Sequence, residues 1–186
     1  LIGINQNTKK SLIENKEENT NKLNTTFSKS MWIVSSPTCV GKSYFLENKG
    51  HRYSQITNLP FSGAHIEYFY AKEWNKIEQF KNKNLCIHLH MGYKDDLIHP
   101  NWNKICKLKH EKKVIILGIS QSEYKIRVEK RLKKYSKTVK HNFDEVINLY
   151  QSWINDLDKK GISYLFVEAK NDYKILDEKN FFRMLI

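Results

Sequence analysis

The sequence has few cysteines, prolines and glycines and no long apolar run, and several of these shortages exclude a class of protein. Its three cysteines, Cys39, Cys86 and Cys106, are odd in number and lack Cys-x-x-Cys spacing, which argues against a disulfide framework and a zinc site. No apolar stretch approaches the ~18 residues of a membrane span. The first residues also lack the basic-then-apolar pattern of a secretory signal. We therefore expect a cytoplasmic protein with no membrane partner.

Acidic residues are also in short supply, since 20 Asp and Glu stand against 32 Lys and Arg, for a net charge of +12. A large part of this excess lies in residues 125–140, where Glu129 is the single acid among Lys125, Arg127, Lys130, Arg131, Lys133, Lys134, Lys137 and Lys140. A basic surface attracts polyanions and gains from counterion release. The other lysines are scattered through an asparagine-rich chain, so nucleic acid is a possible partner but not the favoured one.

The chain of 186 residues, 40% of them hydrophobic, can bury one sizeable core. Residues 1–29 are polar and predict a flexible tail or linker, and residues 31–186 predict the folded domain. Apolar patterns predict strands at 31–35, 53–57, 65–70, 85–91, 113–119 and 162–168. They predict helices at 43–49 (ended by Gly50), 71–82, 102–108, 121–136 and from 143 to a stop at Gly161, with Asn142 and Glu145 as a capping pair. This alternation predicts an α/β fold with a three-layer parallel sheet, helices on both faces and ligands at the carboxyl ends of the strands.

The most informative segment lies between the first strand and the first helix and reads Ser36-Pro37-Thr38-Cys39-Val40-Gly41-Lys42-Ser43. It is a phosphate-binding loop of the Walker A type with serine in place of the first glycine. Backbone N–H groups and the helix N-terminus would converge on a nucleotide phosphate tail. Tyr44, the next residue along the helix, would also border the nucleotide. Lys42 would reach the β- and γ-phosphates, Ser43 would ligate Mg²⁺, and Gly41 would let the backbone approach closely. The alternative is an ordinary βα turn with a solvated lysine.

The segment resembles P-loop nucleoside triphosphate-binding proteins, and the order of elements over residues 31–186 resembles the kinases of the nucleoside and nucleotide type. This resemblance implies a P-loop kinase-like fold that uses ATP and Mg²⁺ to phosphorylate a small metabolite or nucleotide by in-line transfer. In that family, arginines on the helix after a late strand close over the transferring phosphoryl group. Arg127 and Arg131 occupy such a helix here, and a planar guanidinium suits a phosphate.

The family also places an acidic residue at the end of a central strand, and this chain departs from that pattern. The strand Cys86-Ile87-His88-Leu89-His90 ends in histidine. His88 and His90 alternate to the same side of the strand, so we expect His90 to act as base or orienting group and His88 to be a hydrogen-bonded core residue. The other candidate carboxylates are Asp95 and Asp96 in the next loop and Glu67 on another strand. A His-x-His metal site is a lesser alternative, with no third ligand placed by spacing.

Two other functions stay open at this point. The phrase Pro37-Thr38-x-x-Gly41-Lys42-Ser43 also resembles the loop of isopentenyl-transferring enzymes that modify tRNA or adenine nucleotides. The missing strand-end acid is compatible with a nucleotide- or nucleic-acid-binding module that has no turnover. In the kinase interpretation, the family implies that the loop after the last strand, residues 169–173, borders the adenine base.

Overall fold

A computed structural model of the chain describes residues 29–58, 66–92, 99–136, 142–170 and 172–186. Its centre is a six-stranded sheet in the order β2-β3-β1-β4-β5-β6. All neighbouring pairs are parallel except β5 and β6, which are antiparallel. The strands are β1 (Ser30–Ser36), β2 (Glu67–Tyr70), β3 (Leu85–His90), β4 (Glu111–Gly118), β5 (Ser163–Glu168) and β6 (Lys174–Leu176).

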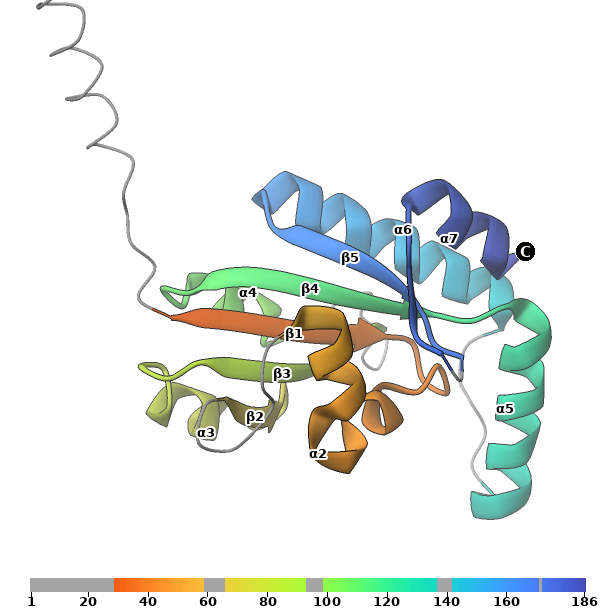
Figure 1. Cartoon of the computed structure of the whole chain (residues 1–186), viewed down its shortest axis with the longest axis horizontal. Coiled ribbons are helices and arrows are strands. Elements are labelled where there is room, and N and C mark those ends of the chain that lie inside the picture. The colour runs from red at the N-terminus through yellow and green to blue at the C-terminus, as the bar shows by residue number, and fades with distance from the viewer. Residues whose placement is uncertain (1–28, 59–65, 93–98, 137–141, 171) are drawn as a thin grey trace, which may run out of the picture.

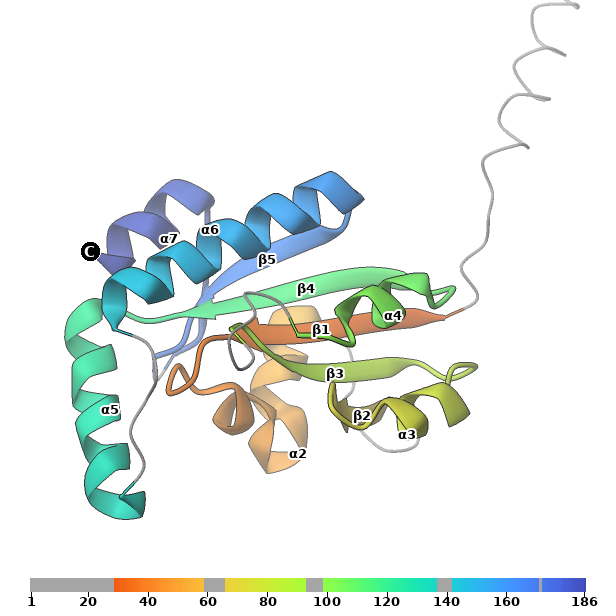
Figure 2. The same ribbon diagram turned by 180° about the vertical axis from the view of Figure 1, so that it is seen from behind.

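Helices cover both faces of this sheet, which confirms the predicted α/β class. They are α2 (Lys42–Thr57), α3 (Trp74–Gln79), α4 (Trp102–Lys107), α5 (Gln121–Tyr135), α6 (Phe143–Lys160) and α7 (Glu178–Leu185). Helix α2 lies on the face turned toward the viewer in Figure 1, and α3, α4 and α6 lie on the opposite face, seen in Figure 2. Because both faces are covered, the central strands are buried over most of their length, as β1 and the second half of β4 show.

The topology brings the ends of three central strands together. Strand β1 lies between β3 and β4 and pairs in parallel with both, with Ser36 aligned to His90 and Ser35 to Ile116. The loop after β1, the end of β3 and the end of β4 therefore meet at the carboxyl edge of the sheet, where open α/β sheets bind ligands. The predicted phosphate-binding loop lies at this edge.

The predicted helix at 43–49 was confirmed, but its predicted end at Gly50 and the predicted strand at 53–57 were wrong. Both segments belong to the single helix α2, which continues through Gly50 to Thr57. Phe45 and Tyr53 are both buried, and their spacing puts them on one side of a helix. The Tyr53 ring packs edge-on against Trp32 of β1, with 6.2 Å between the centroids. Packing on the sheet thus outweighs the cost of a glycine within a helix, which is about 1 kcal/mol.

The later elements follow the prediction closely. The Asn142 side chain accepts a hydrogen bond from the Glu145 N–H at 2.9 Å, and α6 ends at Gly161 with a left-handed φ of 61°. The apolar side of α5 is buried at Tyr124, but Leu132 and Tyr135 farther along it are exposed as the helix extends away from the sheet (Figure 1). The antiparallel strand β6 was not predicted. The predicted tail at 1–29 lies outside the described residues apart from residue 29.

Candidate phosphate-binding site

The loop between β1 and α2 has the backbone conformation that its sequence requires. Gly41 precedes α2 with φ 115°, a value that residues with a side chain rarely adopt, and Cys39 is also left-handed with φ 71°. The Phe45 N–H then donates to the Gly41 carbonyl at 2.9 Å and begins the helix. A Cβ on Gly41 would lie 3.2 Å from Nη1 of Arg127, so the glycine also makes room for that guanidinium.

Lys42 is the most unusual residue of the loop, because it is a lysine with only 4% of its surface exposed. Its Nζ donates to the Ser36 carbonyl at 2.5 Å, to the Pro37 carbonyl at 3.0 Å and to the Ser36 hydroxyl at 3.1 Å. Burial lowers the pKa of Lys42 to about 7, Cys39 opposes this shift, and the charge of Arg131 adds to it. No carboxylate of the described chain contributes to that shift, so the ammonium is held by neutral oxygens alone.

Ser43 and Tyr44 follow Lys42 in the first turn of α2, and both side chains are exposed. The Ser43 hydroxyl is therefore open to a ligand that approaches the helix N-terminus, as a Mg²⁺ ion on a nucleotide would. In the described part of the chain there is no group of three or more His, Cys, Asp or Glu side chains that could hold a metal ion. The His-x-His metal site therefore finds no third ligand among these residues.

The two predicted arginines of α5 differ in what they contact. Arg127 donates from Nη1 to the Val40 carbonyl at 2.7 Å, from Nη2 to the Ala169 carbonyl at 2.9 Å and from Nε to Glu123 at 2.7 Å. Its guanidinium therefore joins α5 to the loop and to the end of β5. The Arg131 side chain is exposed. Burial raises the pKa of Cys39 and lowers the pKa values of Lys42 and His90, and the charge of Arg131 opposes the first shift and adds to the other two. Of the two, Arg131 is the guanidinium available to a phosphate.

The histidines of β3 lie side by side, as the alternation predicted, with 5.1 Å between their ring centroids. His90 is aligned with Ser36 and is exposed next to the start of the loop. His88 is buried, but neither ring nitrogen has a hydrogen-bond partner among the described residues, so the expected hydrogen-bonded core histidine was wrong on that point. Desolvation first and the charge of Lys42 second lower the pKa of both rings, to about 3 for His88. Both imidazoles are neutral at pH 7.

Glu67 is the one candidate carboxylate within the described residues, and it does not reach this site. Glu67 is the first residue of β2 and is aligned with Leu85, the first residue of β3, so it lies at the edge opposite the loop and is wrong as an active-site acid. Asp95 and Asp96 lie outside the described residues. Glu168, at the end of β5, is paired with Lys170 at 2.7 Å.

The segment after β5 contacts α5 through residue 169, and it lies against the loop and α2 through residue 173. The Ala169 carbonyl accepts from Arg127, and the Tyr173 ring packs against Phe45 of α2 with 5.0 Å between centroids. The Tyr173 hydroxyl lies 3.9 Å from the position of a Cβ on Gly41. A contact of this segment with an adenine base stays a prediction. Sequence reasoning missed the closeness of Tyr173 to Gly41, for which the sequence carries no signal.

Comparison with known proteins supports the fold. No family model matches the sequence, and no curated protein is significantly similar to it. Among solved structures, the chain is similar to one from the PezAT chromosomal toxin-antitoxin system of Streptococcus pneumoniae, with a TM-score of 0.54 and 11% identity over 100% of this chain and 90% of that one. The similarity concerns the fold alone, and it confirms the predicted α/β fold with its mostly parallel sheet. Along the described residues, no helix is long and apolar enough to cross a membrane.

Proposed function

We propose that the protein is an ATP-dependent phosphotransferase that acts on a small metabolite or nucleotide. The observation that carries this proposal is Lys42, a buried lysine held by three neutral oxygens of its own loop. A nucleotide phosphate would form an ion pair with this ammonium, which has no carboxylate partner among the described residues. Anions also bind favourably at a helix N-terminus, where α2 begins.

The residues at the site have distinct roles in this proposal. Backbone N–H groups of residues 38–43 and the Lys42 ammonium hold the phosphates, and Arg131 reaches them from α5 and stabilises charge that develops during transfer. Arg127 positions α5 against the loop through its two carbonyl contacts. Ser43 supplies a hydroxyl ligand to Mg²⁺, which when bound with the nucleotide neutralises phosphate charge.

His90 is the proposed orienting group, because its neutral imidazole lies beside the start of the loop and can accept a hydrogen bond from the acceptor hydroxyl. Its lowered pKa makes it a poor proton acceptor. In the transfer step, the bond between the γ-phosphorus and the bridging oxygen breaks while the acceptor hydroxyl oxygen bonds to that phosphorus. The hydroxyl proton passes to an oxygen of the transferred phosphoryl group and then to solvent, and the diphosphate leaves. The sequence and the described residues do not define the acceptor, so the proposal names its class and no single compound.

The first experiment measures binding of Mg·ATP to the full chain by isothermal titration calorimetry. We expect binding by the wild type and a loss of at least tenfold in Lys42→Met, while Lys159→Met, at an exposed lysine near the end of α6, binds as the wild type does. Transfer of labelled γ-phosphate is then followed with a panel of hydroxyl- and phosphate-bearing metabolites and nucleic acid 5′ ends. If Lys42→Met retained transfer, the proposed active site would be wrong.

A nucleotide-binding module without turnover is the second candidate. Two observations favour it. Strand β3 ends in His90 and not in an acidic residue. In the described chain, no carboxylate acts on Lys42. Mg·ATP binding that depends on Lys42, with no label transferred to any acceptor and no ATP consumed, would support it over the kinase. Prenyl transfer from an isopentenyl diphosphate to adenine nucleotides or tRNA would instead support the isopentenyltransferase alternative.

A further inference from the structure

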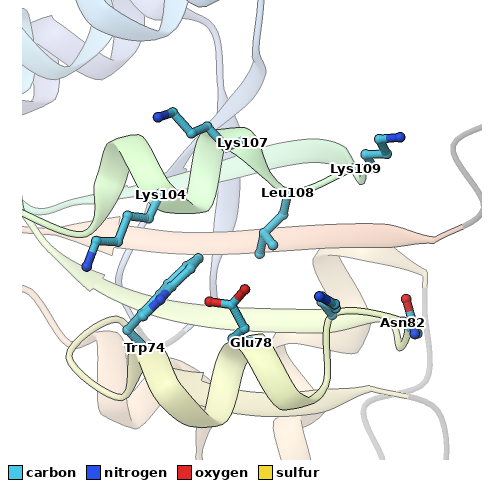
Figure 3. A pocket seen from close by; sticks show the side chains of 8 residues that line it. Trp74, Glu78, Asn82, Lys104, Lys107, Leu108 and Lys109 are labelled. Carbon is cyan, nitrogen blue, oxygen red and sulfur yellow. The ribbon is translucent and has the colours of Figure 1, made fainter.

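A second concave site lies between α3 and α4, on the face of the sheet away from α2 (Figures 2 and 3). It is a cavity of about 540 Å³, and no residue of the phosphate-binding loop lines it. Trp74 of α3 points toward α4, and Leu108, just after α4, points back toward α3 (Figure 3). These two side chains form an apolar centre between the helices.

The rim of this cavity is strongly basic. Glu78 is the one acid that lines it, against Lys81, Lys104, Lys107 and Lys109. All four lysines are exposed, and within the described ranges none of them forms an ion pair. The site therefore combines an apolar centre with uncompensated positive charge, which favours a ligand that is both acidic and partly apolar.

The position of Lys104 distinguishes between two classes of acidic ligand. Its Nζ lies 5.7 Å from the centroid of the Trp74 ring and covers that ring (Figure 3). A nucleobase would have to displace the ammonium in order to stack on the ring, and stacking on aromatic rings is a main source of affinity for single strands. A carboxylate can pair with Lys104 where it is, while an apolar side chain contacts Leu108.

We propose that this cavity binds a short acidic segment of a partner protein, with one apolar side chain between Trp74 and Leu108 and Asp or Glu side chains on the lysines. Helices α3 and α4 have six residues each, so each is about 9 Å long. An extended chain rises about 3.3 Å per residue, so roughly three residues of the partner lie within the cavity and their neighbours reach the rim. The proposal does not depend on the phosphotransferase activity.

The test uses a fluorescein-labelled peptide, Asp-Asp-Glu-Leu-Glu-Asp-Asp, and fluorescence anisotropy with the full chain at fixed ionic strength. Replacing Lys81, Lys104 and Lys107 by glutamine should weaken peptide binding at least tenfold. The control replaces three exposed lysines of α5, Lys125, Lys130 and Lys133, by glutamine and should change the affinity less than twofold. Replacing the peptide leucine by serine should weaken binding several-fold.

Two results would overturn the proposal. If the α5 variant lost as much affinity as the cavity variant, the peptide would be responding to the net charge of the protein and not to this cavity. If an oligothymidine of equal charge bound more tightly than the peptide, and bound more weakly to the cavity variant than to the α5 variant, the site would be a nucleic-acid site instead. Circular dichroism of both variants confirms that each is folded.

Discussion

Lys42 should lower the stability of the folded protein in the absence of a ligand. Its ammonium is buried among neutral oxygens, and burial lowers its pKa from 10.5 to about 7. We expect Lys42→Met to have a higher free energy of unfolding than the wild type at pH 7. Methionine is similar in length and apolar, so it fills the same space with no charge to desolvate.

The size of the effect follows from the pKa difference. A lowering from 10.5 to about 7 corresponds to roughly 5 kcal/mol against the charged form. This figure is a net value, because a pKa shift already includes the hydrogen bonds that favour the charged form. The acceptors keep partners in the variant, because the Ser36 carbonyl also accepts from the Met91 N–H and the Pro37 carbonyl from the Ser36 hydroxyl. We expect a gain of up to about 5 kcal/mol for the variant.

The pH dependence gives this prediction a distinctive form. Between the folded pKa near 7 and the unfolded value of 10.5, the unfolded chain binds a proton at Lys42 that the folded chain does not. The stability of the wild type therefore rises with pH in this window, by up to about 1.4 kcal/mol per pH unit, and the advantage of Lys42→Met shrinks accordingly. Below pH 7 the penalty is complete and the advantage is constant.

Urea unfolding at pH 6.5, 7.5, 8.5 and 9 measures the difference, with Lys159→Met as the exposed-lysine control. Above pH 7 the neutral histidines contribute little to the slope. If the proposed function holds, Mg·ATP should stabilise the wild type more than the variant, because the variant is expected to bind it at least tenfold more weakly. If Lys42→Met were less stable than the wild type at pH 7, or if the difference did not change with pH, the description of Lys42 as a buried charge would be wrong.

Three other substitutions test contacts of the structure. A Cβ on Gly118 would lie 2.6 Å from Cζ of the buried Phe181. Gly118→Ala should therefore lower the free energy of unfolding in urea by about 1–3 kcal/mol. The loss caused by Gly118→Ala should be smaller in a Phe181→Leu background. Asp156→Ala should cost about 1–3 kcal/mol, because the buried Trp102 indole loses its 2.6 Å acceptor, and Asp156→Asn should cost less. Arg127→Ala removes two bonds to carbonyls and should weaken Mg·ATP binding roughly tenfold by calorimetry. Arg127→Lys should recover little of it, because a lysine lacks the planar fork.

The sequence predicted those parts of the fold that depend on local pattern. The capping pair of Asn142 and Glu145 and the stop at Gly161 bounded α6 correctly because caps and left-handed glycines act within a few residues. Continuous apolar runs identified β1, β3 and β4, since both faces of a parallel sheet are buried.

The incorrect predictions all involve contacts between distant segments. Gly50 ends a helix by local rules, but α2 continues through it because Tyr53 packs on Trp32 of another element. Glu67 was considered as an active-site acid without knowing which end of β2 carries it, and the register places it at the wrong edge. The spacing of Arg127 and Arg131 gave a common helix face but could not show that Arg127 is engaged with two carbonyls while Arg131 stays exposed.

The charges around the loop also explain why this site should select a polyanion and not a neutral ligand. Lys42, Arg127 and Arg131 all act electrostatically on Cys39, and the described residues place no carboxylate among the groups that act on it. Arg127 has its carboxylate partner in Glu123, whereas Lys42 and Arg131 have none in the described part of the chain. Two uncompensated cations next to a helix N-terminus are unfavourable until an anion binds between them. The two unpaired cations raise the free energy of the ligand-free protein, and a bound anion removes this penalty. Affinity should therefore rise steeply with the number of phosphates. ATP should bind more tightly than ADP, and ADP more tightly than AMP.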